Sequence, residues 1–111
     1  MSIVPPKPMP ESSPPETLEE RFRRLEATWA AETAYISSST VIRNHPAFLE
    51  IISLGEAVVP LILRELEKRP RLLVWALKQI TGANPVPAAD HGNIAKMCEA
   101  WLRWGHEQGQ R

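Results

Sequence analysis

Apolar side chains recur along the first part of the chain at the spacing of an α-helix. In one stretch they follow one another at steps of four, three, four and seven residues, which places them on a single helical face: Leu18, Phe22, Leu25, Trp29 and Ile36. Charged residues of both signs fill the positions between them, many at the four-residue spacing that favours ion pairs along a helix. Thr17 and Glu20 have the spacing of a capping box. We therefore predict a helix over residues 18–36.

A short turn and a second helix are predicted next. Residues 37–40 are three serines and a threonine, whose hydroxyls compete for backbone hydrogen bonds and so end the first helix. One of these residues caps a short turn. Pro46 then begins a helix that has Asn44 or His45 near its cap and that stops before Gly55.

Two adjacent helices follow in the middle of the chain. Residues 56–68 carry apolar side chains on nearly every side, so we expect this helix at the centre of the fold. Pro60 is tolerated because it falls in the first turn. Residues 70–81 form the next helix, which Gly82 ends. We expect Trp75, in the middle of this helix, to be the centre of the core.

The last helix follows residues 83–92, the longest irregular stretch inside the domain, which two prolines and a glycine bend. Asn93 is an acceptable cap. Apolar residues then recur at helical spacing on one face, which includes Cys98 and Trp101. We predict that this helix ends at Gly105.

The pattern as a whole predicts an all-α protein, because no segment alternates with the two-residue period of a strand. We expect a compact bundle of four to five helices in one domain, residues 16–106, with a frayed C-terminus over residues 107–111. Residues 1–15 contain six prolines and few apolar side chains, which predicts a disordered proline-rich tail. Two interpretations of this tail stay open: a ligand for an aromatic groove on a partner, or a solvated leader.

The amino-acid composition argues against several classes of function. The 111 residues include 13 Lys and Arg and 13 Asp and Glu, so the net charge is zero and the broad positive surface of a dedicated nucleic-acid binder is missing. Cys98 is the single cysteine, which excludes an intramolecular disulfide. The sequence has neither the apolar core of a signal peptide nor the ~18 consecutive apolar residues that cross a bilayer. We expect a cytoplasmic protein that binds no membrane.

Catalytic and metal chemistry find little support in the sequence. One serine of residues 37–39 can be combined with His45 and Asp90, but no glycine-flanked nucleophile elbow surrounds any of these serines. Cys98 lies on an apolar face, where cysteine behaves as a small core residue. His91 has no second ligand on the same helical face. We predict no catalytic residue, no metal site and no cofactor.

Two surface features are candidates for binding another protein. Four basic side chains, which we call the basic corner, concentrate near the turn between the two central helices: Arg64, Lys68, Arg69 and Arg71. Trp104 follows Trp101 by three residues and so falls at the edge of the buried face, and exposed tryptophan is frequent at interaction hot spots. In the alternative interpretation, residues 64–78 contact nucleic acid. The wider stretch of residues 37–82 carries only six basic against four acidic residues, which makes this partner the less favoured one.

Two resemblances bear on function. Residues 54–66, LGEAVVPLILREL, resemble the second helix of a HEAT-type repeat, and residues 71–82 are similar to the first helix of the next one. This likeness implies a HEAT-like helical hairpin within the bundle. Residues 45–47 and 101–105, together with 54–66, also resemble a family of small uncharacterised bacterial proteins, which implies one partner of a two-gene cassette. We therefore expect a non-catalytic protein–protein interaction module, an antitoxin-like or regulatory partner of another small protein.

Overall fold

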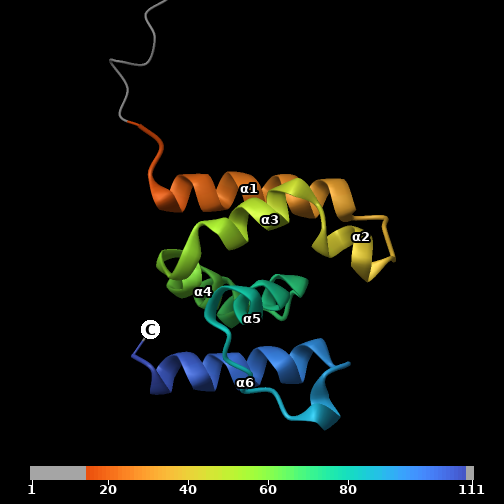
Figure 1. The fold of residues 1–111 in the computed structure, drawn as a ribbon, viewed down its shortest axis with the longest axis vertical. Helices are drawn as coiled ribbons and strands as arrows, with labels where there is room; N and C mark the ends of the chain where they lie inside the picture. Colours follow the sequence, from red (N-terminus) through yellow and green to blue (C-terminus); the bar gives the residue numbers. More distant parts are fainter. Residues whose placement is uncertain (1–14, 110–111) are drawn as a thin grey trace, which may run out of the picture.

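The structure, a computed structural model, describes residues 15–109, which fold into helices joined by short connections (Figure 1). In chain order the α-helices are α1 (Leu18–Thr33), α2 (Ser39–Arg43), α3 (Pro46–Ser53), α4 (Val59–Lys68), α5 (Trp75–Thr81) and α6 (Ile94–Glu107). Short 3-10 helices occupy Gly55–Val58, Leu72–Val74 and Ala88–Asp90, and the described range contains no strand. The all-α prediction is confirmed. The part of the chain described has six α-helices instead of four or five, because the turn after the serines is itself a short helix, α2.

The helices stack in three layers (Figure 1). α1 packs on α3, α3 contacts α5, and α4 contacts α6, so the layer of α4 and α5 separates the layer of α1 and α3 from α6. The prediction of a central helix is confirmed, since five side chains in and just before α4 are at most 2% exposed: Val58, Val59, Ile62, Leu63 and Leu66. α1 and α6 therefore close the two sides of one continuous core.

Local side-chain chemistry sets several helix ends. The capping box of α1 is confirmed: Oγ1 of Thr17 accepts a hydrogen bond from the Glu20 amide at 3.1 Å, and Oε1 of Glu20 accepts one from the Thr17 amide at 2.9 Å. His45 caps α3, because its Nδ1 accepts a hydrogen bond from the Ala47 amide at 3.0 Å. Gly82 ends α5 in the left-handed conformation, with φ of 76°.

The expectation that Trp75 is the centre of the core is wrong. The helix predicted over residues 70–81 is divided into the 3-10 helix Leu72–Val74 and α5, which begins at Trp75. This change of helix type alters the rotation per residue, and the neighbours of Trp75 take the fully buried positions: Leu73, Val74, Ala76 and Leu77. Trp75 itself is only half-buried. Trp29 and Trp101 are 4% and 2% exposed and are core residues, as predicted.

Two helix ends differ from the prediction. α1 ends at Thr33, three residues before the predicted end. α6 continues through Gly105 to Glu107, so residue 106 is not the boundary of the folded part. Gly105 is buried, and the packing of α6 against α4 outweighs the roughly 1 kcal/mol that glycine costs inside a helix.

Part of the predicted organisation lies outside the described residues, namely the proline-rich tail of residues 1–15 except for Pro15, and residues 110–111. Within residues 15–109, no single helix is long and apolar enough to span a membrane. α3 and the helical segment Gly55–Lys68 reach that length together, but they meet at an angle of 105°.

Candidate functional site

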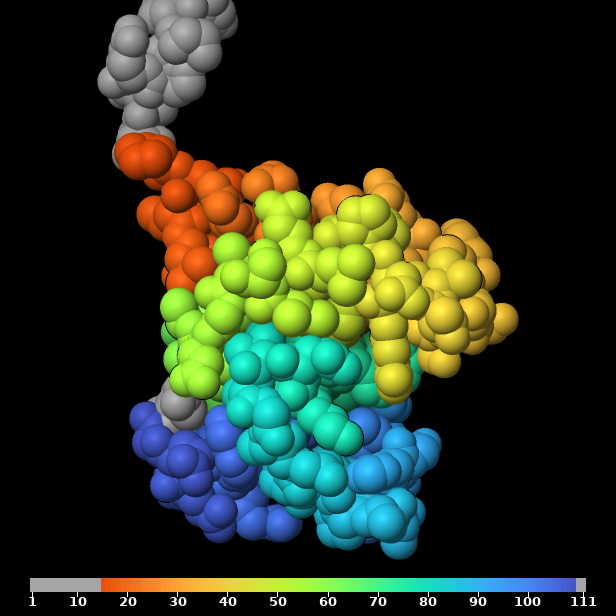
Figure 2. Space-filling model, viewed as in Figure 1, coloured from red at the N-terminus to blue at the C-terminus, as the bar shows by residue number. Residues whose placement is uncertain are grey.

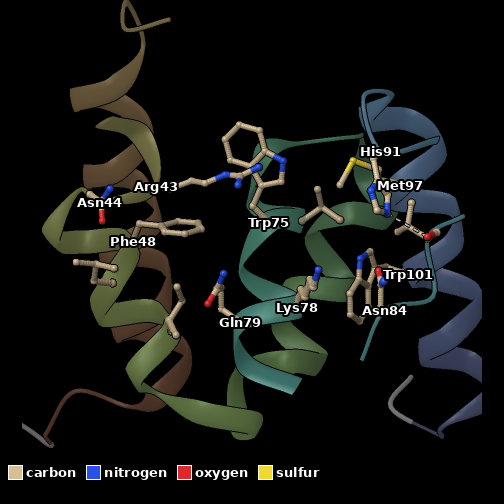
Figure 3. A pocket seen from close by; sticks show the side chains of 14 residues that line it. Arg43, Asn44, Phe48, Trp75, Lys78, Gln79, Asn84, His91, Met97 and Trp101 are labelled. Atoms are coloured by element: carbon tan, nitrogen blue, oxygen red, sulfur yellow. Dashed lines mark hydrogen bonds between the residues drawn. The ribbon is translucent and has the colours of Figure 1, made fainter. Parts of the chain in front are cut away.

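A groove crosses α5 between α3 and α6 (Figure 3). Its volume is about 420 Å³, within the range of about 300–1,000 Å³ that is usual for ligand-binding pockets. Arg43 and Phe48 lie on its α3 side, Asn84 and Trp101 lie on its α6 side, and Trp75 stands between them on α5. In the space-filling view the yellow region of α2 and the teal region of α5 meet on one face of the molecule (Figure 2).

Arg43 is held over Trp75 at the α3 side of the groove. Its guanidinium carbon is 4.0 Å from the centroid of the Trp75 ring, the geometry of a cation–π contact. The short helix α2 is fixed from both ends: the Ser38 hydroxyl accepts a hydrogen bond from the Val41 amide at 3.3 Å, and the Ile42 carbonyl accepts one from Nε1 of Trp29 at 2.9 Å. Because buried Ile42 anchors α2, the next side chain, Arg43, projects outward to the groove.

The polar groups of the groove are cationic or neutral. Arg43 and Lys78 carry full positive charges, and three carboxamides accompany them: Asn44, Gln79 and Asn84. A ring nitrogen of His91 is 3.2 Å from the Val86 carbonyl oxygen, which fixes the imidazole at the α6 side (Figure 3). None of the residues that line the groove is an aspartate or a glutamate. The groove therefore attracts anionic groups.

Apolar side chains form both walls. On the α3 side, Phe48 is buried and Leu49 is 47% exposed, which is high for a large apolar residue. On the α6 side, Val86 and Trp101 are buried and Met97 is half-buried. A ligand of this groove thus meets cations and apolar surface together, a combination that suits an amphipathic segment rather than a simple ion.

The predicted basic corner is largely neutralised within the chain. Arg64 lies 3.5 Å from a carboxylate oxygen of Glu19, and Nζ of Lys68 lies 3.1 Å from Oε2 of Glu65. Arg69 is exposed and has no carboxylate partner within the described residues. None of these side chains lines the groove. Whether the corner binds a partner remains a prediction, but most of its charge is already paired.

Arg71 is not the exposed cation that the sequence predicted. Its side chain is 14% exposed and forms ion pairs with Glu26 of α1 and Glu65 of α4, the latter at 3.1 Å. Burial removes water from the guanidinium and lowers its pKa from the ordinary value. The carbonyl of Arg71 also accepts a long hydrogen bond, 3.8 Å, from the Cys98 thiol. Arg71 is thus a structural link between α1, α4 and α6.

Trp104 lies at the edge of the buried face of α6, as predicted, and is half-buried. Its ring packs edge-on against Trp101, with centroids 5.1 Å apart and planes at 73°. Trp104 does not line the groove, whereas Trp101 does. The structure therefore does not bring Trp104 into the groove, and its role as a hot spot remains a prediction.

Of the two cations of the groove, the sequence interpretation missed Arg43, and it included Lys78 only in the segment of the nucleic-acid alternative, residues 64–78. A signal for them exists, since neither residue has a carboxylate three or four positions away in the sequence, whereas Arg23 and Lys68 do. In the structure, Arg23 and Lys68 pair with those neighbours, Glu19 and Glu65. The signal is not unique to the groove, since Arg21 also lacks such a neighbour and pairs with Glu16, five positions away.

Cys98 and the histidines form no reactive cluster in the part of the chain described. Cys98 is 2% exposed, and burial raises the pKa of its thiol, which keeps the sulfur protonated at neutral pH. His45 connects two helices, with Nε2 at 2.7 Å from Oε1 of Glu32 and Nδ1 on the α3 cap. Residues 15–109 contain no group of three or more His, Cys, Asp or Glu side chains that could hold a metal ion.

The groove thus combines unpaired cations, an arginine stacked on a tryptophan, and apolar walls on both sides. The ion pairs of Arg71 with Glu26 and Glu65 lie outside it and link α1 and α4. No protein-family model, no curated protein and no solved structure matches this chain.

Proposed function

We propose that this protein is a non-catalytic, HEAT-like interaction module that binds a segment of another protein in the groove across α5. The observation that carries the proposal is the lining of this groove, which joins exposed apolar surface at Leu49 to cations that have no carboxylate partner within the described residues. Apolar side chains supply most of the affinity of an interface, and unpaired charges select the partner and speed its association.

A protein segment suits this groove better than a nucleic acid does. Binding of single strands relies on free aromatic faces for base stacking, but Arg43 already covers a face of Trp75. Lys78 and Arg43 are the only two lysine or arginine side chains that line the groove within the described range, too few to follow a phosphate backbone. The aliphatic surface of Leu49, Ile52 and Val86 matches side chains instead.

The resemblance to small bacterial proteins encoded in pairs supports the product of the neighbouring gene as the partner. In that role the chain is a regulatory or antitoxin-like subunit, since it contributes contacts and no chemistry. The partner's segment crosses α5 and buries Leu49 and the α3 side of the groove.

Co-expression with the neighbouring gene product tests this function. We expect the two proteins to elute together in size-exclusion chromatography, and we expect Leu49→Gln to weaken their affinity about tenfold, because it removes apolar contact at the groove without adding charge. Isothermal titration calorimetry of the purified partners measures this change.

Leu18→Gln is the matched control, because Leu18 is also an exposed large apolar residue, 37% exposed, but lies outside the groove on α1. We expect the affinity of the Leu18→Gln variant for the neighbouring gene product to equal that of the unmodified chain. Separate elution of the two proteins, or equal affinities for the two variants, contradicts the proposed function.

A further inference from the structure

Some basic side chains of the molecule have carboxylate partners and others do not. On the side of α1 and α4, six basic side chains each lie within ion-pair distance of a carboxylate of the same chain: Arg21, Arg23, Arg24, Arg64, Lys68 and Arg71. At the groove, Arg43 and Lys78 have no such partner among the described residues, and no acidic side chain lines the groove. Other described cations without a carboxylate partner, such as Arg69, lie singly on the surface, whereas the groove brings two of them together without an acidic neighbour.

The contact with Trp75 restricts the Arg43 side chain and leaves its guanidinium edge free to bind a carboxylate. A guanidinium group is planar and carries its N–H donors at the edge, so an aromatic ring can contact its face while the edge stays free for hydrogen bonds. Trp75 contacts Arg43 in this way, with the guanidinium carbon 4.0 Å from the ring centroid. The contact restricts a long and flexible side chain before any ligand arrives, which reduces the entropy lost on binding. The free edge matches the two oxygens of a carboxylate.

The two cations lie on different sides of Trp75. Arg43 reaches over this ring from the α3 side, whereas Lys78 points to the side of Asn84 and Trp101 (Figure 3). Apolar surface accompanies each cation, with Phe48 and Leu49 near the first. A complementary ligand consequently carries more than one negative charge and an apolar side chain.

We propose that the groove recognises an acidic peptide segment with an apolar or aromatic side chain, one carboxylate of the segment binding Arg43 edge-on and another binding Lys78. This inference rests on the proposed function and specifies the chemistry of the partner's segment. The exposed side chain of Leu49 receives the apolar side chain, and the carboxamides of Gln79 and Asn84 accept hydrogen bonds from the peptide backbone or donate hydrogen bonds to it.

Blocked synthetic pentapeptides test the inference. The probe is Asp-Glu-Phe-Glu-Asp, and its neutral counterpart of the same shape is Asn-Gln-Phe-Gln-Asn. We follow the indole signal of Trp75 and the side-chain Nε signal of Arg43 by NMR in the full ¹⁵N-labelled chain. The acidic peptide is expected to shift both signals with a Kd at least about tenfold lower than that of the neutral peptide. This preference is expected to shrink as NaCl rises from about 0.05 M to about 0.5 M.

Two double variants with equal loss of charge separate the groove from the general charge of the protein. Arg43→Gln with Lys78→Gln is expected to raise the Kd of the acidic peptide at least about tenfold. Lys96→Gln with Arg103→Gln, which changes two exposed residues of α6 outside the groove, is expected to leave it within about twofold. All four substituted positions are exposed, so the variants keep their core contacts, and circular dichroism spectra verify that they remain folded.

Three results overturn the inference: equal affinity for the acidic and neutral peptides, equal losses in the two double variants, or tighter binding of an eight-nucleotide oligo(dT) than of the acidic peptide. These failures are separable from failure of the proposed function. If Leu49→Gln still weakens the affinity for the neighbouring gene product while Leu18→Gln does not, the interaction function holds and only the acidic character of the segment is rejected.

Discussion

Arg69 and Arg71 are two residues apart but lie in opposite environments. The Arg71 side chain is 14% exposed and pairs with Glu26 and Glu65, whereas Arg69 is exposed without a carboxylate partner in the described range. Burial lowers the pKa of Arg71, which shows that removal from water opposes its charge. The two carboxylates offset this cost, and their own burial makes them dependent on the arginine.

At the residue scale, we predict that Arg71→Gln lowers the free energy of unfolding by about 3 kcal/mol, because it leaves the partly buried carboxylate of Glu26 without a cation and that of Glu65 with Lys68 alone. Arg69→Gln is the same chemical change at an exposed site and is expected to stay within about 0.5 kcal/mol of the unmodified chain. Urea denaturation of both variants measures the difference. Adding Glu26→Gln to the Arg71 variant is expected to restore part of the loss. Equal losses for the two arginine variants would reject the structural role of Arg71.

At the scale of elements, two glycines show how backbone conformation ends a helix. Gly82, after α5, has φ of 76°, in the left-handed region, whereas Gly92, before α6, does not have a positive φ. A Cβ atom built at either position meets nothing within 4 Å. Steric contact is therefore excluded as a cause of any difference, and only the backbone conformation distinguishes the two sites.

We predict that Gly82→Ala lowers the free energy of unfolding by about 1 kcal/mol, because alanine is strained at a positive φ. Gly92→Ala is expected to be neutral or stabilising by up to about 1 kcal/mol, since it reduces the entropy of the unfolded chain. Thermal unfolding of the two variants decides the comparison. A destabilised Gly92 variant alongside an unchanged Gly82 variant would be the opposite of this expectation.

The elements that local chemistry specifies could be predicted from the sequence, and those that packing specifies could not. Thr17 and Glu20 form a capping box within four residues, and Gly82 adopts the left-handed conformation without strain. The start of α1 and the end of α5 were therefore predictable from local sequence. The division of residues 70–81 into a 3-10 helix and α5 has no such signal in the sequence. It depends on how Leu73 and Leu77 fit among other helices, and it determines that Trp75 faces the groove.

At the scale of the whole molecule, the central layer makes the three layers interdependent. Trp29 belongs to the layer of α1 and α3, and Trp101 belongs to α6 on the other side of α4. Leu63 of α4, in the central layer, is fully buried. The outer layers share one core and have no separate cores of their own.

We predict that Leu63→Ala lowers the free energy of unfolding by about 3 kcal/mol and shifts the loss of the Trp29 and Trp101 indole NMR signals to lower urea together. Coincident transitions are expected because the folded part is a single cooperative unit. The unmodified chain and Leu18→Gln, a change at a partly exposed position, serve as references. Loss of the Trp101 signal well before that of Trp29 would contradict this prediction and would make α6 an independently unfolding layer.

The groove belongs to the same scale, which explains why the sequence alone pointed elsewhere. Arg64, Lys68, Arg69 and Arg71 are close in sequence and so are conspicuous, but the fold supplies carboxylates from α1 and α4 to three of them. Arg43 and Lys78 are 35 positions apart and become parts of one groove only when α3 packs against α5. Local density of charge is visible in a sequence, but its compensation by distant carboxylates, such as Glu19 for Arg64 and Glu26 for Arg71, is not.

The hydrogen bond from the Trp29 indole to the Ile42 carbonyl, 2.9 Å long, has a consequence for how this chain can evolve. α2 has five residues and is too short to be stable without contacts to other elements. The position of Arg43 therefore depends on the Trp29 side chain of α1, which does not itself line the groove. Substitution of Trp29 is therefore constrained in any homologue in which Arg43 still binds its ligand. We expect a change of residue 29 to be accompanied by a change of residue 43 among diverging homologues, whereas loss of the arginine leaves Trp29 constrained by its place in the core.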